Sequence, residues 1–481
     1  MLSPEVMLDR FLARDHTYDG RFLTAVKTTG IYCLPSCPAR SPLPRNVRFF
    51  DSEPEARAAG FRACKRCRPD RFYRDEDPEA DNVEKVAHAI ADAPAAWEGA
   101  TDIAEAVGVG STRLTELFRR HYHTTPAAWL QRQRIRQAGH ALLFGRGNAL
   151  DCGLSSGFES ASAFHENFRR ETGMSPGAYR KLRRATSFSI TLPDDFRVDD
   201  TLNYLVRDEG GVGETLDGRR FRKAVCLTSG PAILDCVADP AAGSVTCRVV
   251  ADRTLCANDL AAAHRIVIRL FPIDVDPGPF ERRLARTRGM SRLIRGRRGL
   301  RIPRTATLYE GIVWTIVGQQ VNLAFAHSLR ATLIELCGPP APNGLRAHPR
   351  AEDVARLDVA DLARRRYSRR KAEYVIDTSR ALVEGSLSLV EGTTEPATRL
   401  ERRLLRVRGI GPWSANYLLM RGFGFDDCVP IGDVALLAAL VRFFDRETRP
   451  DADETRELMR PFAPWRSLAT FHFWKSLGDP A

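Results

Sequence analysis

Apolar and polar positions follow two different periodicities along this chain. From about residue 80 to 184, apolar residues recur at helical spacing and strand signals are few, which predicts a helical segment. From about 187 to 273 the pattern alternates, and a helical stretch from Asn258 to Leu270 closes this region. After an interruption at 274–279 the pattern is helical again. The predicted strands are Ser187 to Leu192, Phe221 to Cys226 and Ser244 to Val250.

The helical segment contains an internal repeat with an offset of 50 residues. Residues 112–120 (TRLTELFRR) align with residues 162–170 (SAFHENFRR). The match continues from 125–129 (TPAAW) to 175–179 (SPGAY). A repeat of this size predicts a duplicated helical module.

The chain is too long for a single hydrophobic core, since it has 481 residues. Four segments of different texture predict domains at 1–75, 80–184, 187–273 and 274–481, with an acidic linker around 75–78. Wholesale disorder is excluded by a composition that is 43% hydrophobic and 27% charged. No run approaches the roughly 18 apolar residues of a membrane span, and the first residues carry no secretory signal. We therefore expect no membrane association and a cytoplasmic protein.

The formal net charge is +12, and it is unevenly distributed. Residues 1–75 hold 14 basic and 9 acidic residues, a net charge of +5, and residues 274–481 hold 34 and 25, a net charge of +9. The segment 76–186 is formally neutral. A basic balance favours nucleic acid as a partner without establishing it.

Four of the eleven cysteines form two close pairs. Cys33 and Cys37 are separated by three residues, and Cys64 and Cys67 by two. One turn can present two sulfurs to one metal ion, so two such turns predict a tetrahedral Zn²⁺ site. The other seven cysteines show no such pairing. For the two close pairs the alternatives are scattered free thiols or an inert structural zinc, and spacing does not distinguish an inert site from a reactive one.

The residues around these pairs, 28–40 (TTGIYCLPSCPAR) and 59–67 (AGFRACKRC), resemble the N-terminal zinc domain of the Ada family. That family regulates the bacterial response to DNA alkylation. The resemblance implies that Cys33 accepts a methyl group from DNA methylphosphotriesters. Zn²⁺ keeps Cys33 as a thiolate at neutral pH, so the nucleophile needs no separate base.

Methyl transfer would also change the charge of the zinc site. Four thiolates around Zn²⁺ carry a formal charge of −2, which repels DNA phosphates, and methylation of one sulfur reduces it to −1. Nearby cations would then hold phosphate more tightly. These cations are Arg40, Arg45, Arg48, Arg62, Lys65 and Arg66.

Residues 101–111 (TDIAEAVGVGS) predict a helix, a glycine turn and a second helix with Ser111 as its N-cap. In this helix-turn-helix the helix from Ser111 to Phe118 would enter the major groove. With residues 157–160 (GFES) and 173–176 (GMSP), the segment resembles the AraC-type two-module DNA-binding domain, which implies promoter DNA and RNA polymerase as partners. The second module departs from that pattern, because its first helix contains Gly153, and glycine costs about 1 kcal/mol in a helix interior.

The C-terminal segment contains 406–416 (RVRGIGPWSAN), in which Gly409 and Gly411 separate two helical stretches. Glycines let backbone N–H groups approach a phosphate, and the next helix N-terminus adds partial positive charge. The pattern predicts a helix-hairpin-helix clamp on the DNA backbone.

With residues 316–321 (IVGQQV) and 430–433 (PIGD), the segment from about 187 to 481 resembles the AlkA family of 3-methyladenine DNA glycosylases. The resemblance implies that Asp433 is the catalytic carboxylate, whereas Asp426 and Asp427 are more typical of a solvated turn. It further implies that Gln320 fills the gap left by a flipped base, where AlkA has Leu. The residues matched to the base pocket are Trp413, Tyr417 and Trp465.

Three absences narrow the expected chemistry. Bifunctional relatives carry a Lys where this chain has Trp413, so we expect a monofunctional glycosylase that leaves an abasic site. No cysteine follows Cys428, so the C-terminal iron–sulfur cluster of other relatives is not expected. No cysteine precedes a histidine, which removes the O6-alkylguanine methyltransferase motif of Ada.

The chain thus resembles an Ada–AlkA fusion of multidomain α+β class. We expect a small zinc domain, an all-helical double helix-turn-helix, a β-rich α+β subdomain and a helical helix-hairpin-helix domain. The predicted function is excision of alkylated purines from double-stranded DNA and methyl transfer to Cys33, linked to transcription at the nucleoid. The alternative is a methylation-sensing regulator whose glycosylase half only binds DNA.

Overall fold

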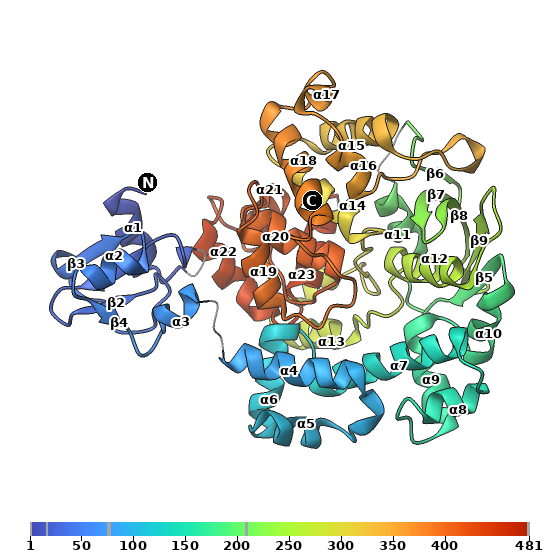
Figure 1. Cartoon of the computed structure of the whole chain (residues 1–481), viewed down its shortest axis with the longest axis horizontal. Helices are drawn as coiled ribbons and strands as arrows, with labels where there is room; N and C mark the ends of the chain where they lie inside the picture. Colours follow the sequence, from blue (N-terminus) through green and yellow to red (C-terminus); the bar gives the residue numbers. More distant parts are fainter. Residues whose placement is uncertain (1, 16–17, 75–77, 207–209, 479–481) are drawn as a thin grey trace. The chain divides into compact units, whose positions relative to one another are not determined.

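The computed structural model describes residues 2–15, 18–74, 78–206 and 210–478 (Figure 1). The chain divides into two compact units, one of residues 1–85 with 450–457 and one of the remaining residues. The central part of the predicted linker, 75–77, lies outside the described residues. The domain bounds expected from the sequence stay a prediction.

The first unit contains a small four-stranded sheet with strand order β3-β1-β2-β4. Strands β1 and β2 and strands β1 and β3 pair antiparallel, whereas β2 and β4 pair parallel. Side chains of Ser3 and Ser52 cap the N-termini of α1 and α2, and each helix has proline in its first turn. The elements are α1 (Pro4–Leu12), β1 (Leu23–Val26), β2 (Ile31–Cys33), β3 (Val47–Phe50), α2 (Glu53–Ala58), β4 (Arg62–Ala63) and α3 (Pro69–Tyr73).

The segment from 80 to 184 is helical, as predicted, and holds two modules. Helix α5 ends at Gly108, whose φ of +77° is in the left-handed region that glycine favours. The predicted N-cap of the next helix is wrong, because Gly110 occupies that position and Ser111 is the first helical residue. The helices are α4 (Pro78–Asp92), α5 (Ala100–Val107), α6 (Ser111–Tyr122), α7 (Pro126–Phe144), α8 (Ala149–Leu154), α9 (Ala161–Thr172) and α10 (Pro176–Lys181).

A five-stranded antiparallel sheet follows, with strand order β5-β9-β8-β7-β6. The three predicted strands and the closing helix are confirmed, whereas β6 and β8 were not predicted. The short β6 offers only four residues, and β8 contains a Gly-Pro pair that reads as a turn. The elements are β5 (Ser187–Thr191), α11 (Val198–Leu205), β6 (Glu214–Asp217), β7 (Arg220–Leu227), β8 (Gly230–Asp239), β9 (Ser244–Val250) and α12 (Ala257–Leu270).

The second helix-turn-helix module and this sheet share one hydrophobic core. Phe164 and Phe168 from α9 are buried in the same cluster as Ile190 of β5 and Val267 of α12. The imidazole of His264 also bonds the Thr172 carbonyl oxygen at 2.8 Å. The second module therefore packs against the sheet as part of one compact unit.

The remaining chain is helical and carries the hairpin. Two further cores form here, one around α14, α18 and α20 and one around α13, α21 and α23. Among the described residues, no helix has the length and apolar character that crossing a membrane requires. The helices are α13 (Gly278–Arg286), α14 (Leu308–Val317), α15 (Leu323–Cys337), α16 (Ala351–Ala355), α17 (Val359–Ala363), α18 (Arg369–Val383), α19 (Ala397–Leu405), α20 (Pro412–Leu418), α21 (Val434–Phe443), α22 (Ala452–Met459) and α23 (Arg466–Ser476).

The glycine inside α8 has a packing reason. A Cβ at Gly153 would lie 2.5 Å from Cδ1 of the buried Phe164 ring. We expect Gly153→Ala to destabilise the protein by about 1–3 kcal/mol, because overpacking outweighs the gain of about 1 kcal/mol in helix propensity. Thermal unfolding followed by circular dichroism measures the effect.

The matched control is Gly177→Ala in α10, where a Cβ would meet no atom within 4 Å. The melting temperature of this variant should be unchanged or raised. Equal melting temperatures for both variants would contradict the packing argument.

Candidate functional site

The small sheet brings Cys33 and Cys64 together. Strands β2 and β4 are parallel and pair Tyr32 with Ala63. The residues that come next, Cys33 and Cys64, therefore lie at the same edge of the sheet. The Cys64 N–H donates to the Tyr32 carbonyl oxygen at 2.9 Å, which holds the two ends side by side. This parallel pair explains how sulfurs 31 residues apart become neighbours.

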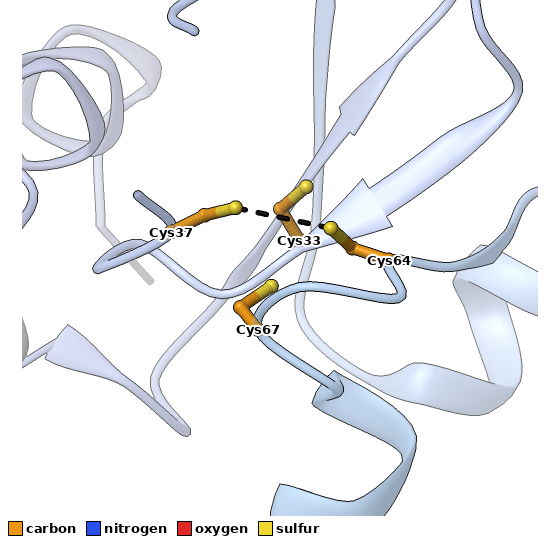
Figure 2. Close-up of side chains that lie close together, drawn as sticks. All are labelled: Cys33, Cys37, Cys64 and Cys67. Carbon is orange, nitrogen blue, oxygen red and sulfur yellow. Dashed lines mark hydrogen bonds between the residues drawn. The ribbon is translucent and has the colours of Figure 1, made fainter. Parts of the chain in front are cut away.

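Cys37 and Cys67 complete the cluster from turns that follow each strand (Figure 2). All four Sγ atoms lie within 4.8 Å of one another, and those of Cys37 and Cys64 are 3.9 Å apart. A tetrahedral Zn²⁺ with Zn–S bonds of about 2.3 Å requires sulfurs about 3.8 Å apart. Four thiols at this spacing suit zinc, and the predicted zinc site is confirmed.

A residue that sequence analysis missed fixes the first turn. Asp19 accepts from the Ser36 N–H at 3.0 Å and from the Ser36 hydroxyl at 2.6 Å. Burial raises the pKa of Asp19 to about 6, although both hydrogen bonds oppose the shift. Asp19 lies far from the cysteine motif in sequence, so no local pattern indicates this contact.

The predicted phosphate-binding cations flank the cysteines on exposed positions. Arg62 and Lys65 lie on either side of Cys64 in sequence, and Arg48 stacks over the Phe50 ring with 4.7 Å to the centroid. The exposed residues of this set are Arg40, Arg45, Arg48, Arg62, Lys65 and Arg66. Their charges are therefore accessible to a polyanion.

Asp433 is held by three donors. It is the N-cap of α21, where its Oδ1 accepts from the Leu436 N–H at 2.7 Å and from Nε1 of Trp474 at 2.9 Å. Its Oδ2 accepts from Nε1 of Trp413 at 2.9 Å. These bonds use three of the four lone-pair positions of the carboxylate, so one on Oδ2 stays available to water or to a cation.

Aromatic rings surround this carboxylate. The ring centroids of Trp413 and Tyr417 are 5.3 Å apart, and those of Tyr417 and Trp474 are 6.0 Å apart. The Tyr417 hydroxyl accepts from Nε1 of Trp314 at 3.0 Å and from Arg421 at 3.3 Å, which fixes the ring. Electron-rich faces of this kind attract a cationic base.

The structure brings Trp413, Tyr417 and Asp433 together, whereas the contacts described for Trp465 are with other residues. Trp465 packs at the edge of the core around α13, α21 and α23, with the Arg283 guanidinium 5.9 Å from its ring centroid. Trp474, nine residues later on α23, makes the contact with Asp433. In the sequence, the second tryptophan of this helical stretch was the signal that could have indicated this contact.

Glycine occurs at the two hairpin positions for different structural reasons. Gly409 has a φ of +91°, and a Cβ there would lie 2.4 Å from the Tyr374 ring, so only glycine fits. Gly411 is the N-cap of α20 with no neighbour within 4 Å of its Cβ position, which leaves room for a phosphate.

The predicted wedge residue lies in the loop between α14 and α15. Gln320 is exposed and has a φ of +53°, a left-handed conformation that non-glycine residues rarely adopt. The neighbouring Gln319 donates through Nε2 to the Gly409 carbonyl oxygen at 2.7 Å and to the Ser414 hydroxyl at 3.0 Å. Gln319, which sequence analysis did not single out, thus connects the wedge loop to the hairpin.

Asp426 and Asp427 lie in a turn, as expected, and both residues are half-buried. Burial raises the pKa of Asp426 to about 6. Burial alone would raise the pKa of Asp427 as well, but the hydrogen bonds and charge of Arg466, at 2.7 Å for each oxygen, hold it below its ordinary value. The Asp427 carboxylate therefore serves the structure in this region through its ion pair with Arg466.

A cavity of about 370 Å³ lies away from these residues, lined in part by Tyr309, Glu310 and His348. It contains none of the predicted site residues. The candidate functional sites are therefore the surroundings of Asp433 and the cluster of four cysteines, and neither is in this cavity.

Three family models match successive parts of the chain. The metal binding domain of Ada matches residues 7–70, a helix-turn-helix domain matches residues 103–182, and the HhH-GPD superfamily of base excision DNA repair proteins matches residues 313–464. Together they define a DNA-repair protein joined to a DNA-binding regulator.

The whole-chain comparison agrees. A probable bifunctional transcriptional activator/DNA repair enzyme AlkA of Mycobacterium tuberculosis is 31% identical over 97% of this chain and 95% of its own length. The chain belongs to this family of bifunctional activator and repair enzymes.

Other relatives match separate halves. The DNA-3-methyladenine glycosylase of Bacillus subtilis is 29% identical over 60% of this chain and 96% of its own length. The bifunctional Ada protein of Escherichia coli is 35% identical, and the chain covers 47% of it. The structure of a 3-methyladenine DNA-glycosylase from Archaeoglobus fulgidus, with a TM-score of 0.52 and 19% identity over 60% of this chain and 97% of its own, shows the shared fold.

The cysteine cluster predicts one bound zinc ion per chain. We expect Cys64→Ser to lose most of the zinc, because a hydroxyl does not replace a thiolate ligand, and to destabilise the zinc domain. Elemental analysis of the purified protein measures the zinc content. The control is Cys256→Ser at an exposed thiol outside the cluster, which should keep its zinc. Equal zinc loss in both variants, or a wild type without zinc, would contradict the assignment.

Proposed function

We propose that this chain releases alkylated purine bases such as 3-methyladenine from double-stranded DNA, as a monofunctional glycosylase. The observation that carries this proposal is Asp433, fixed by Leu436 and by two indoles, close to aromatic rings and to the hairpin. The names of the relatives support the same reaction.

The reaction needs few groups once the base has left the stack. The N3- or N7-alkylated purine is cationic and would stack on Trp413 and Tyr417, with Gln320 filling the vacated space. The C1′–N bond breaks and its electron pair neutralises the base. Asp433 stabilises the oxocarbenium sugar, and water adds to C1′ while its proton passes to Asp433 and then to solvent.

We further infer that Cys33 accepts a methyl group from DNA methylphosphotriesters. Bound zinc supplies a thiolate at neutral pH. The Cys33 sulfur attacks the methyl carbon, an S–C bond forms, and the C–O bond breaks with its electrons left on the phosphodiester. The product is a thioether, so each chain reacts once.

Methylation would strengthen binding of the zinc domain to DNA through its exposed cations. The exposed N-terminal residues of α6, Thr112 and Arg113 among them, would read promoter bases. We propose RNA polymerase as the partner of the DNA-bound protein, in the cytoplasm and at the nucleoid.

The first test is Asp433→Asn. Asparagine is also a good N-cap, so the fold should persist while the negative charge is lost. We expect base release from methylated duplex DNA, measured by chromatography, to fall by at least about 10²-fold.

The control is Asp217→Asn, at an exposed position on β6, which should keep full activity. A wild type that binds DNA without releasing a base would favour the alternative of a regulator whose glycosylase half only binds DNA. An Asp433→Asn variant as active as the wild type would remove Asp433 from the mechanism.

The second test follows the methyl group. After incubation with methylphosphotriester DNA, we expect peptide mass spectrometry to locate one methyl group on Cys33. Cys256→Ser, with the cluster intact, should be methylated to the same extent. A methyl group on Cys37, Cys64 or Cys67, or on no cysteine, would overturn the assignment.

A further inference from the structure

The end of helix α6 in the first helix-turn-helix module contacts the glycosylase domain through consecutive residues. His121, which is buried, bonds the Thr398 hydroxyl at 2.8 Å through Nδ1. The Tyr122 hydroxyl donates to the Thr394 carbonyl oxygen at 2.6 Å. Thr398 is in the first turn of α19, the first helix of the hairpin, and Thr394 lies just before it, so this contact reaches the element that leads into the DNA clamp.

The next residue contacts a second part of the same domain. Nδ1 of His123 accepts from the Asp427 N–H at 3.1 Å and lies 3.8 Å from Sγ of Cys428. The imidazole also meets the Phe425 ring edge-on, with centroids 5.3 Å apart. Burial lowers the pKa of His123 to about 4, so the ring is neutral at physiological pH and its Nδ1 is free to accept.

The segment that His123 contacts leads directly to Asp433. The Asp427 carboxylate bonds Arg466, the first residue of α23, and Cys428 N–H donates to the Ser467 hydroxyl at 2.9 Å. Helix α23 carries Trp474, which bonds Asp433. The chain itself runs from Asp427 to Asp433 in six residues. His123 therefore contacts a loop that is connected to Asp433 in two ways. One connection is the chain itself, and the other runs through α23 and its Trp474.

The internal repeat shows that His123 occupies a backbone position that favours glycine. Its counterpart in the second module, 50 residues later, is Gly173. Both end a helix in the left-handed conformation, with φ of +53° for His123 and +69° for Gly173. Glycine adopts this conformation without strain, whereas most residues with a Cβ adopt it at a cost in conformational energy. The first module carries histidine despite this cost, and the cost is offset by the contacts with residues 425–428.

We propose that His123 of the helix-turn-helix domain is a positioning residue for the glycosylase, holding the loop 425–433 and hence Asp433 in its reactive place. This inference rests on the proposed base-releasing function. The regulator half would then be a structural part of the repair enzyme, in addition to its own contacts with DNA.

The test variant is His123→Gly, which installs the residue of the second module and removes the side chain without backbone strain. We expect the single-turnover rate of base release to fall about tenfold, since small displacements of a reacting group are costly. The affinity for methylated duplex DNA should stay within about twofold of wild type, because no residue of the clamp changes. The Asp427 amide should exchange its hydrogen faster with solvent, since its acceptor is gone.

The conservative variant is His123→Asn. Asparagine tolerates the left-handed conformation and offers a carbonyl acceptor close to the position of Nδ1, so it should restore most of the rate and the protection of the Asp427 amide. The matched control is His140→Ala, an exposed histidine on α7, which should behave as wild type in both measurements.

A His123→Gly variant with wild-type rate and wild-type exchange at Asp427 overturns the proposal. So does a slow variant with unchanged exchange, or one that asparagine does not rescue. If the wild type released no base, the proposed function would fail, and exchange at Asp427 in the two variants would still decide whether His123 holds the loop.

Discussion

Four buried charges connect the sheet to the helical domain, and the positions of α14 and α15 depend on them. Arg330 on α15 bonds both oxygens of Glu214 on β6, at 3.0 and 2.8 Å, and Lys223 on β7 bonds Glu214 at 2.7 Å and Glu310 on α14 at 3.0 Å. Burial alone would raise the pKa of Glu310, but the two cations hold it below its ordinary value. Loss of one partner would leave a buried charge without its counter-ion, at a cost of about 3–5 kcal/mol. Since α14 and α15 flank the loop with Gln320, this network also fixes both ends of that loop.

The features that sequence analysis predicted well are those whose chemistry demands a local pattern. Two close cysteine pairs indicate zinc because a turn must present adjacent sulfurs, and the fold supplies the missing link through the parallel pairing of β2 and β4. The helix-turn-helix needs a left-handed glycine at Gly108, which is visible as a helix break. Strands β5, β7 and β9 have enough alternating residues to be detected. The role of Asp433 rests on a family resemblance and stays a prediction, and the residue lies at the N-cap of α21.

The features that were missed depend on contacts between distant residues. Trp465 and Trp474 lie on one stretch of chain, and only the direction of α23 decides which indole faces Asp433. Asp19 acts on the zinc turn through a tertiary hydrogen bond, and Gln319 acts on the hairpin in the same way. From sequence alone Gly153 is interpreted as a destabilising residue within a helix, and its contact with the Phe164 ring explains why glycine is required. Neither periodicity nor spacing contains this information, because each case is decided by what packs against the residue.

The surface formed by residues 391–398 and 425–428 is covered by the helix-turn-helix domain, through Tyr122, His123 and the bond from Arg136 to the Gly392 carbonyl oxygen at 2.8 Å. Because this face of the glycosylase domain is already covered, a macromolecule that binds the domain has to approach it from another side.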